Sequence, residues 1–376
     1  MKRLIYLSPV PWASFAQRPQ KFIQWFHSCT GGSVLWIDPY PTRFPRLVDL
    51  RRLKISKNPV MTQCPNWVKV LKPAALPLEP LPGSGWVNAF FWQKTINCSV
   101  KFAEDHETLI VVGKPSLLAL LVLKKLKGLR SVYDSMDDFP SFYRGFTRNS
   151  VERREVRLVK SVSDIWVTST QLKKKWQNIR CDLQFVPNAL DASLLPPISI
   201  KTEKNQTKIF GYVGTIAEWF DWNWIVALAK ARAQDTIRLI GPVFHPARMT
   251  LPENIEILPE RPHAAALHAM LDFDVGLIPF IKNDLTASVD PIKFYEYRAL
   301  GLPVMSTNFG EMKFRANEPG TFISEMPEDV GAIAELALCF QDDSLYAKKF
   351  SIENSWENRF NATKLLTESL SNPAAQ

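Results

Sequence analysis

The sequence predicts an α/β protein of two domains that face each other across a cleft, each built on a parallel sheet with helices on both faces. Short apolar runs alternate with longer helical patterns along both halves of the chain, as in βαβ units. Near residues 192–207 the pattern lapses into a stretch rich in proline, lysine, threonine and asparagine, which is typical of a linker. The 376 residues suffice for two domains, which we place at 1–191 and 208–355. This arrangement favours a ligand that bridges the carboxyl ends of both sheets.

In the first half, six apolar runs predict strands at Leu4–Leu7, Val34–Ile37, Leu109–Val112, Ser131–Asp134, Ile165–Thr168 and Leu183–Val186. Helical patterns lie between them, near residues 18–28, 86–104, 115–127, 148–162 and 170–178. The segment 39–85 is rich in proline and poorly periodic, so we expect a long excursion at the sheet edge.

The second half repeats the alternation. Strands are predicted at Ile209–Val213, Ile237–Ile240, Ile255–Leu258, Val275–Pro279 and Val304–Ser306. Helices are predicted near residues 222–233, 263–271, 291–300, 328–340 and 344–370.

Charge divides the chain. Residues 1–190 contain 29 Lys and Arg against 13 Asp and Glu, and the remainder contains 17 against 24, which together give the net charge of +9. A basic face attracts nucleic acid, anionic lipid or anionic substrate. Because no nucleic-acid-reading motif is present, we expect the basic first domain to meet an anionic membrane surface and no nucleic acid. Each basic cluster taken alone is most simply explained as a solvated helix face, and it is their presence together in one half that favours a membrane; they lie at 51–54, 124–127, 153–157 and 173–175.

Cysteine usage and hydropathy bear on location. The five cysteines are widely spaced and show no metal-ligand spacing, so we expect reduced, mostly buried thiols. Pro9 and Pro11 interrupt the apolar start of the chain, which argues against a signal peptide, and the longest apolar run, Leu117–Leu123, is too short to cross a bilayer. We therefore expect a cytoplasmic protein that can lie peripherally on the inner face of the plasma membrane.

The segment 290–304 carries the strongest functional signal. Asp290 can cap a helix, Pro291 suits its first position, and Gly301 suits the left-handed residue after its end. Lys293 is unusual, because a cation in the first turn opposes the helix dipole unless an anion such as a phosphate also binds there. Glu296, on the same face, can accept hydrogen bonds from a pair of sugar hydroxyls. A phosphate site one turn from a ribose site describes a nucleotide-sugar site.

A second motif, Phe210–Asp221, is a strand that ends in a glycine loop. Gly214 allows backbone N–H groups to approach a phosphate closely. The alternative is a tight turn before a helix capped by Asp221.

Three carboxylates, Asp134, Asp137 and Asp138, follow a predicted buried strand and are expected to point toward the cleft. Such groups can act as a base, bind an acceptor hydroxyl or ligate a metal. The alternative is that they cap a helix and shape a turn. We expect no essential metal, because a lysine and a helix terminus already neutralise the diphosphate.

Other polar residues have weaker signals. Arg18 is expected to contact an anionic group across the cleft, Gln20 a sugar hydroxyl, and Asn188 the ligand or the backbone at the interdomain edge. A solvent-exposed helix start and a structural turn remain the alternatives. His263 and His268 are expected at the surface, without metal-ligand spacing.

These motifs together resemble those of two-domain nucleotide-sugar glycosyltransferases of the GT-B fold, in particular the bacterial group-1, GT4-like enzymes that build surface polysaccharides. The resemblance spans nearly the whole chain. Beyond the residues above it is carried by Val167–Ser169, Asp191, Leu302–Val304 and Ser355–Glu357. It implies two Rossmann-like domains and a C-terminal helix, about 356–372, that crosses back to the first domain.

The resemblance also implies roles for individual residues. Gly214 and Thr215 would offer backbone donors to the diphosphate, Lys293 would neutralise it, Glu296 would hold the ribose, and Arg261 would lie near the base. The sequence departs from the family in two places. Ser288 stands where larger members have a glutamate, and the usual Arg/Lys pair after the glycine loop is missing.

The predicted function is transfer of a sugar from a nucleoside diphosphate donor to a lipid-linked or oligosaccharide acceptor in cell-surface polysaccharide synthesis, such as lipopolysaccharide or capsule. The candidate catalytic groups are Asp137, Asp138 and Lys293, and no cofactor is expected. The family favours retention of anomeric configuration. Two alternatives stay open: a sugar-nucleotide epimerase of the same fold, and a non-catalytic sugar-nucleotide-binding scaffold.

Overall fold

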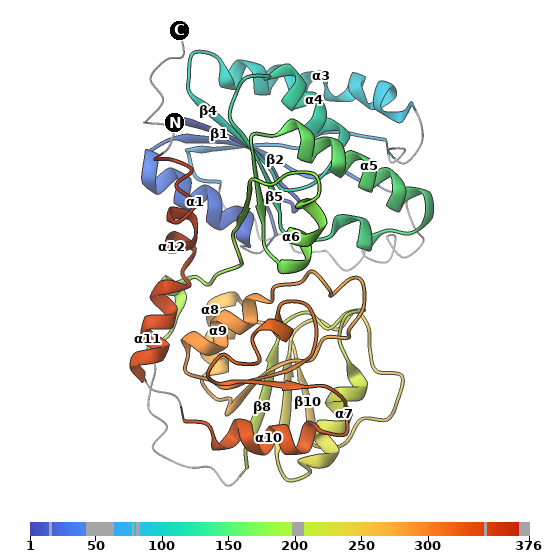
Figure 1. The fold of residues 1–376 in the computed structure, drawn as a ribbon, viewed down its shortest axis with the longest axis vertical. Helices are drawn as coiled ribbons and strands as arrows, with labels where there is room; N and C mark the ends of the chain where they lie inside the picture. The colour runs from blue at the N-terminus through green and yellow to red at the C-terminus, as the bar shows by residue number, and fades with distance from the viewer. Residues whose placement is uncertain are drawn as a thin grey trace. The chain divides into compact units, whose positions relative to one another are not determined.

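The computed structural model describes residues 1–14, 17–42, 64–76, 79, 83–197, 207–341 and 344–367. The chain forms two compact units. The first comprises Met1–Val186 together with the chain from Phe360 onward, and the second comprises Pro187–Arg359. Each unit has its own sheet with helices on both faces (Figure 1).

The first unit contains a wholly parallel seven-stranded sheet in the order β3-β2-β1-β4-β5-β6-β7. Its strands are β1 Arg3–Leu7, β2 Ser33–Ile37, β3 Val68–Leu71, β4 Thr108–Val112, β5 Ser131–Ser135, β6 Asp164–Val167 and β7 Leu183–Phe185. The six predicted strands are confirmed. We expected residues 39–85 to form a long excursion at the sheet edge, but this segment supplies the edge strand β3. Residues 43–63, with the basic cluster at 51–54, lie outside the described residues.

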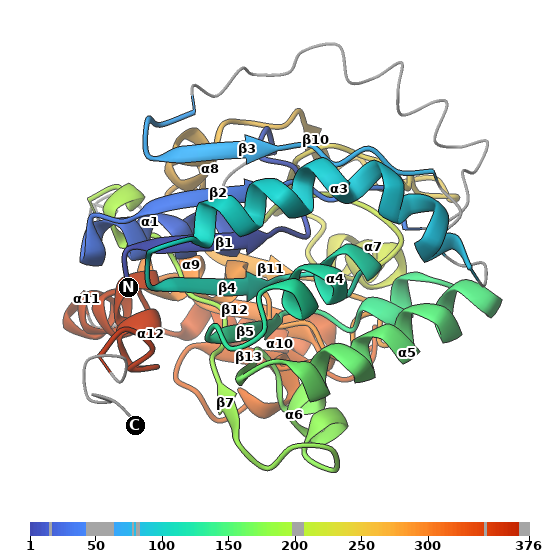
Figure 2. The same cartoon turned by 90° about the horizontal axis from the view of Figure 1, so that it is seen from above.

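Helices cover both faces of this sheet (Figures 1 and 2). They are α1 Arg18–Thr30, α3 Ser84–Ala103, α4 Leu117–Lys125, α5 Gly145–Ser161 and α6 Thr170–Trp176. Alternate strand residues face opposite ways, so Ile5 packs with α3, α4 and α5 in one core, whereas Tyr6 packs on Phe22 of α1, with ring centroids 5.7 Å apart. Ser116 and Ser169 cap α4 and α6 with their side chains, which fixes where these two helices begin.

The second unit contains a parallel six-stranded sheet in the order β10-β9-β8-β11-β12-β13. Its strands are β8 Ile209–Val213, β9 Thr236–Ile240, β10 Ile255–Leu258, β11 Val275–Ile278, β12 Val304–Thr307 and β13 Thr321–Ser324. Its helices are α7 Trp222–Ala231, α8 His263–Met270, α9 Ile292–Ala299, α10 Val330–Cys339 and α11 Ser344–Glu353, and α12 Trp356–Asn361 begins in this unit and ends in the first. The five predicted strands are confirmed, and β13, four residues at the sheet edge, is an addition.

The last predicted helix, 344–370, is two helices. Between α11 and α12 the Leu190 N–H donates to the Asn354 carbonyl at 3.0 Å, and the Trp356 N–H donates to the Leu190 carbonyl at 3.0 Å. This bridge to the segment after β7 interrupts the helical hydrogen bonds. The chain then returns to the first unit, where Phe360 packs on Phe22 at 5.2 Å, so the expected return is confirmed up to residue 367, the last described there.

The cysteine prediction was wrong in part. All five thiols are free, but Cys29, Cys64, Cys181 and Cys339 are exposed and only Cys98 is half-buried. The exposed ones lie near the ends of helices or in the turns before strands, where the chain meets solvent. Within the described ranges, the longest and most apolar helices still fall short of a bilayer-crossing segment.

Both sheets have a topological switch point. Strand order reverses at β1, which lies between β2 and β4, and again at β8, which lies between β9 and β11. In open parallel sheets the loops on the two sides of such a strand separate at their carboxyl ends and leave room for a ligand. These two edges are therefore where a site is expected.

Candidate functional site

In the second unit, α9 starts at the switch point. The buried Tyr297 hydroxyl accepts the Val213 N–H at 3.1 Å, which ties α9 to the end of β8. The Tyr297 ring lies against β11 at Gly276, where any Cβ would be 2.5 Å from the ring. The helix can approach the sheet this closely only over glycine, and this contact fixes the position of its N-terminus.

Three polar side chains meet beside that N-terminus. The buried Glu296 carboxylate accepts from Lys293 Nζ at 2.6 Å, and its other oxygen lies 2.7 Å from His263 Nε2 at the start of α8. Burial alone would raise the pKa of Glu296, but Lys293 and His263 more than offset this and hold its pKa below the ordinary value. Lys293 and Glu296 thus share a helix face, as predicted. His263 is half-buried against the carboxylate rather than a plain surface residue, whereas His268 is exposed.

Asp290 needs correction. The N-cap residue of α9 is Pro291, and the buried Asp290 carboxylate instead accepts from Arg315 at 2.7 Å, from the Tyr295 hydroxyl at 3.0 Å and from the Asn188 N–H at 2.7 Å. The Asn188 side chain also donates to the Asp290 carbonyl at 2.7 Å. Asn188 is therefore a turn residue anchored to the loop before α9, which is the structural alternative for it. Gly301 is left-handed after α9, with φ 75°, as predicted.

The glycine loop lies at the end of β8. The Gly214 N–H donates to the Ile240 carbonyl at 2.9 Å, so it is not available to a phosphate in this conformation, contrary to expectation. Gly214 has φ 156°, and a Cβ at Gly241 would lie 2.1 Å from the Gly214 carbonyl oxygen, so the turns after β8 and β9 touch through their main chains. Thr215 is half-buried, and Asp221 caps α7 by accepting the Trp224 N–H at 3.0 Å. The donor role of this loop stays a prediction that rests on Thr215.

Arg261 is exposed, two residues before His263 at the start of α8. His263, two residues after it, contacts Glu296, and the role of Arg261 toward the base stays a prediction. The participation of His263 was missed from the sequence. The sequence shows only that His263 follows a proline in the first turn of a predicted helix. No nearby sequence pattern indicates that it contacts a residue on another helix.

In the first unit, Arg18 forms a buried ion pair. Its Nε and one terminal nitrogen each donate to Asp134 at 2.8 Å. Arg18 and Asp134 are 3% and 0% exposed, so this pair holds α1 to β5, and the alternative of a solvent-exposed helix start is wrong. Gln20 is also buried, and its side-chain oxygen accepts the Gln17 N–H at 3.0 Å in a capping box. Their ligand contacts stay predictions.

Asp137 and Asp138 follow β5 but have different surroundings. Burial, then the neighbouring Asp134, raises the pKa of the half-buried Asp137 to about 7, although Arg18 opposes the rise. Asp138 is paired with Lys175 at 2.5 Å, and Lys175 also donates to the buried Glu155 at 2.8 Å. Asp137 therefore has the pKa of a general base near neutral pH, whereas Asp138 is held in an ion-pair network. Across the described ranges, no cluster of three or more His, Cys, Asp or Glu is arranged to hold a metal.

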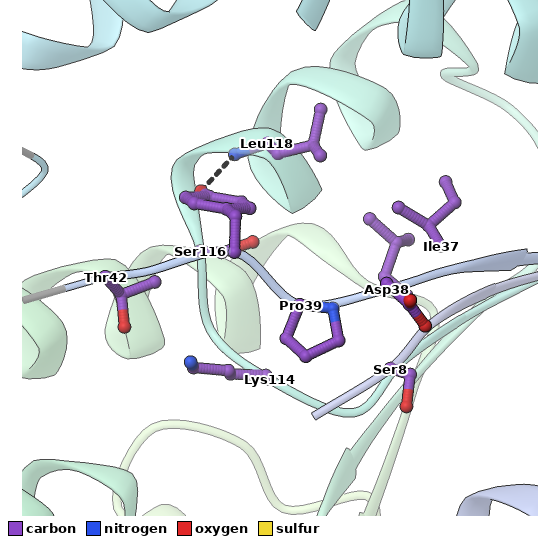
Figure 3. A pocket seen from close by; sticks show the side chains of 10 residues that line it. Ser8, Ile37, Asp38, Pro39, Thr42, Lys114, Ser116 and Leu118 are labelled. Carbon is purple, nitrogen blue, oxygen red and sulfur yellow. Dashed lines mark hydrogen bonds between the residues drawn. The ribbon is translucent and has the colours of Figure 1, made fainter. Parts of the chain in front are cut away.

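A pocket missed by sequence reasoning opens at the switch point of the first sheet (Figure 3). Ser8 follows β1, Asp38 follows β2, and Lys114 and Ser116 follow β4. Asp38 accepts the Trp12 N–H at 2.7 Å and the Trp36 indole N–H at 2.8 Å, which fixes its carboxylate at the pocket wall. A cation, a carboxylate and four hydroxyl-bearing side chains around a small opening suit a polar ligand, and Lys114 can bind an anionic group of it.

Comparison with known proteins begins with the sequence. No family model matches the chain. TuaH of Bacillus subtilis (strain 168), named as a proposed teichuronic acid biosynthesis glycosyltransferase, is 26% identical over 179 residues, which are 43% of this chain and 45% of TuaH. The match thus spans less than half the length of that relative.

Similarity to solved structures extends over the whole chain. Sucrose-phosphate synthase from Thermosynechococcus elongatus has a TM-score of 0.68 at 13% identity, covering 98% of this chain and 99% of that one. HepE of Anabaena, solved in complex with UDP and glucose, has a TM-score of 0.66 at 13% identity, covering 99% and 100%. These likenesses, with the two parallel sheets, show that the chain has the GT-B fold.

Proposed function

We propose that the chain is a glycosyltransferase that uses a nucleotide-sugar donor. The observation that carries the proposal is the N-terminus of α9 at the switch point of the second sheet, with Lys293 and a buried Glu296 beside it. HepE, which shares the fold, was solved with UDP and glucose. The second unit is proposed as the donor side and the first unit as the acceptor side.

The donor site follows from the charges around α9. Because Glu296 already neutralises Lys293 and Asp290 is paired with Arg315, the partial positive charge of the helix N-terminus can take a further anion, and a diphosphate can supply it. The Lys293 ammonium has three N–H groups and gives one to Glu296, which leaves others to turn toward the diphosphate. Glu296, kept ionised by Lys293 and His263, is then an acceptor for ribose hydroxyls, and Thr215 and Arg261 are the proposed further contacts.

In the proposed reaction, the acceptor hydroxyl oxygen forms a bond to the anomeric carbon while the bond from that carbon to the diphosphate oxygen breaks. Negative charge develops on the leaving diphosphate, where Lys293 and the α9 N-terminus stabilise it. The hydroxyl proton passes to a base, for which we propose Asp137 because its pKa is about 7. We assign Asp138 to holding Lys175 rather than to proton transfer. We propose retention of anomeric configuration, which requires the hydroxyl to attack from the same face of the sugar from which the diphosphate leaves.

We propose a lipid-linked or oligosaccharide acceptor in cell-surface polysaccharide synthesis, made on the cytoplasmic face of the membrane. The partial likeness to TuaH, whose name refers to teichuronic acid, supports this class. The pocket beside Lys114 is the proposed acceptor contact, because its cation can bind a phosphate that links saccharide to lipid.

The test is a thermal-shift panel of UDP-, GDP-, dTDP- and ADP-sugars on the wild-type chain. A ligand at about 100 times its Kd should stabilise the protein by about 2.7 kcal/mol and raise its melting temperature. Lys293→Ala and Glu296→Ala should abolish the shift and sugar transfer while staying folded by circular dichroism. Lys230→Ala, an exposed lysine in the last turn of α7, is the matched control and should behave as wild type.

Full nucleotide binding and transfer in both α9 variants would refute this site. Conversion of donor without any acceptor would instead identify an epimerase. Binding without turnover in the presence of membrane extracts would identify a scaffold.

A further inference from the structure

Three aromatic side chains of the first unit project into solvent. Trp86 and Phe90 on α3 are 89% and 83% exposed, and Phe146 at the start of α5 is 87% exposed. Trp86 and Phe90 are four residues apart and share one helix face, opposite the buried Asn88 and Trp92. Large rings exposed to this extent, grouped rather than scattered, indicate an interaction surface.

The charged side chains next to these rings in sequence are basic. Lys94 continues the Trp86–Phe90 face by one more turn, and Arg144 and Arg148 flank Phe146; all three are exposed. Residues 84–103 contain no Asp or Glu, and in α5 the first acidic residue is the exposed Glu152, one turn after Arg148. We call Trp86, Phe90, Phe146, Lys94, Arg144 and Arg148 the aromatic–basic patch.

Glu79 ties the two helices of the patch together. Its carbonyl accepts from the Ser84 hydroxyl at the start of α3 and from Arg154 of α5, at 3.1 and 2.9 Å. Its carboxylate, almost fully buried, accepts from Arg154 at 2.8 Å and from the Leu117 N–H at 3.0 Å. Glu79 thus joins the start of α3 to the middle of α5, and in both views the two helices begin at the same end of the unit (Figures 1 and 2).

That end is also the edge where the strands finish. Leu117, which Glu79 holds, directly follows Ser116 of the pocket in Figure 3, and α5 follows the aspartates at the end of β5. The acidic residues after α3, Glu104 to Glu107, lie at the opposite end, where β4 begins. The first turn of α3, which carries Trp86, thus lies beside the start of α4, where Ser116 lines the proposed acceptor pocket.

We propose that the aromatic–basic patch docks the first unit onto an anionic lipid bilayer. Aromatic rings favour the interface between headgroups and hydrocarbon, and lysine and arginine are attracted to anionic headgroups. A protein partner of this patch would need an acidic apolar groove, whereas a bilayer needs only the two features that the patch has. The inference deepens the proposed function and rests on it for the acceptor, because docking here brings a lipid-linked saccharide to the pocket edge.

The experiment measures sedimentation of the full chain with vesicles of phosphatidylcholine alone or with roughly one third phosphatidylglycerol. The wild-type chain should bind the anionic vesicles, and binding should weaken as salt rises. The aromatic variant (Trp86→Ser, Phe90→Ser, Phe146→Ser) should lose at least about tenfold in affinity, which corresponds to about 1.4 kcal/mol.

Two further variants separate the contributions. The charge variant (Lys94→Gln, Arg144→Gln, Arg148→Gln) should also lose at least about tenfold and should no longer respond to salt. The control removes exposed apolar side chains from the second unit instead, at Met326, Leu336 and Leu345, each changed to serine. It should bind vesicles as the wild-type chain does.

Each variant is also tested for nucleotide-sugar thermal shift, which should be unchanged because the patch and α9 lie in different units. If the wild-type chain binds vesicles but its melting temperature does not change with any nucleotide-sugar, the proposed function is overturned and the patch is not. Wild-type levels of vesicle binding in the aromatic variant would overturn the patch. So would a concentration-dependent dimer that the aromatic variant abolishes, because the patch would then bind a second copy of the chain.

Discussion

At the scale of single residues, one buried carboxylate organises the proposed donor site. Glu296 could be predicted because its spacing from Lys293 places both on one helix face. Its second partner, His263, could not, because the contact joins two helices that are separate in sequence and meet only once the sheet has formed. The prediction that Asp290 caps α9 was wrong for a related reason. Its local pattern fits a helix cap, but the tertiary contact with Arg315 takes its carboxylate away.

Asp137 gives a test of pH dependence. Its folded-state pKa of about 7 exceeds the ordinary 3.8, so the folded chain binds this proton more tightly than the unfolded chain does. The stability it contributes is complete below pH about 4 and is lost as pH rises through about 7. Asp137→Asn carries no such charge. Its free energy of unfolding relative to wild type should therefore rise between pH about 4 and 7, by an amount on the order of 1–4 kcal/mol, and then level off.

The measurement is urea unfolding of both proteins across that pH range. Glu155, whose pKa is also about 7, titrates in both proteins and cancels in the difference. A difference between the two that does not vary with pH would contradict the assignment. If Asp137 is the base, the same variant should lose about a hundredfold or more in sugar transfer with unchanged nucleotide affinity.

At the scale of elements, periodicity was a reliable guide wherever an apolar run was long enough. Eleven strands were recognised, and the two that were missed, β3 and β13, are four residues each and lie at or beside sheet edges, where only part of the strand is buried. The break between α11 and α12 was also missed. It arises from a bridge to Leu190, and no local sequence pattern encodes a contact of that range.

The seating of α9 on β11 can be tested with Gly276→Ala. The added Cβ would lie 2.5 Å from the Tyr297 ring, so α9 must shift. We expect a loss of about 1–3 kcal/mol in unfolding free energy and weaker nucleotide-sugar binding, since the shift displaces Lys293. In a Tyr297→Ala background the ring is gone and the same substitution should cost much less, as a double-mutant cycle by urea unfolding would show. Equal costs in the two backgrounds would mean that the ring contact does not set the position of α9.

At the scale of the whole molecule, the sequence predicted two α/β units and the return of the chain to the first. The sequence did not predict which charged side chains lie on the surface. Charge counts pointed to a basic first unit, but Arg154 and Lys175, which belong to two of its basic clusters, are buried or engaged with Glu79 and Glu155. Side chains that pair across a fold cannot be separated by counting from those that face solvent.

The returning segment can be tested through Phe360, which is fully buried among aromatic rings of the first unit, including Phe22 and Trp25. Phe360→Ala should destabilise that unit by about 3–5 kcal/mol, because it leaves a cavity under α1. Phe314→Ala, at a ring that is 51% exposed, should change stability by no more than about 0.5 kcal/mol. Calorimetry measures the thermal unfolding of both variants and of the wild-type chain. Indistinguishable melting would show that the C-terminal segment does not brace the first unit.

The contact between the turns after β8 and β9 bears on how distant relatives of this chain can be found. At Gly241 the neighbouring atoms belong to the main chain of Gly214, so no repacking of side chains can make room for a larger residue. Any relative that keeps this contact must therefore keep a glycine at the position of Gly241, whereas at Gly214 an added Cβ would meet the side chain of Tyr212. A search keyed to a glycine just past the end of β9 should reach relatives whose overall sequence identity is too low to reveal them.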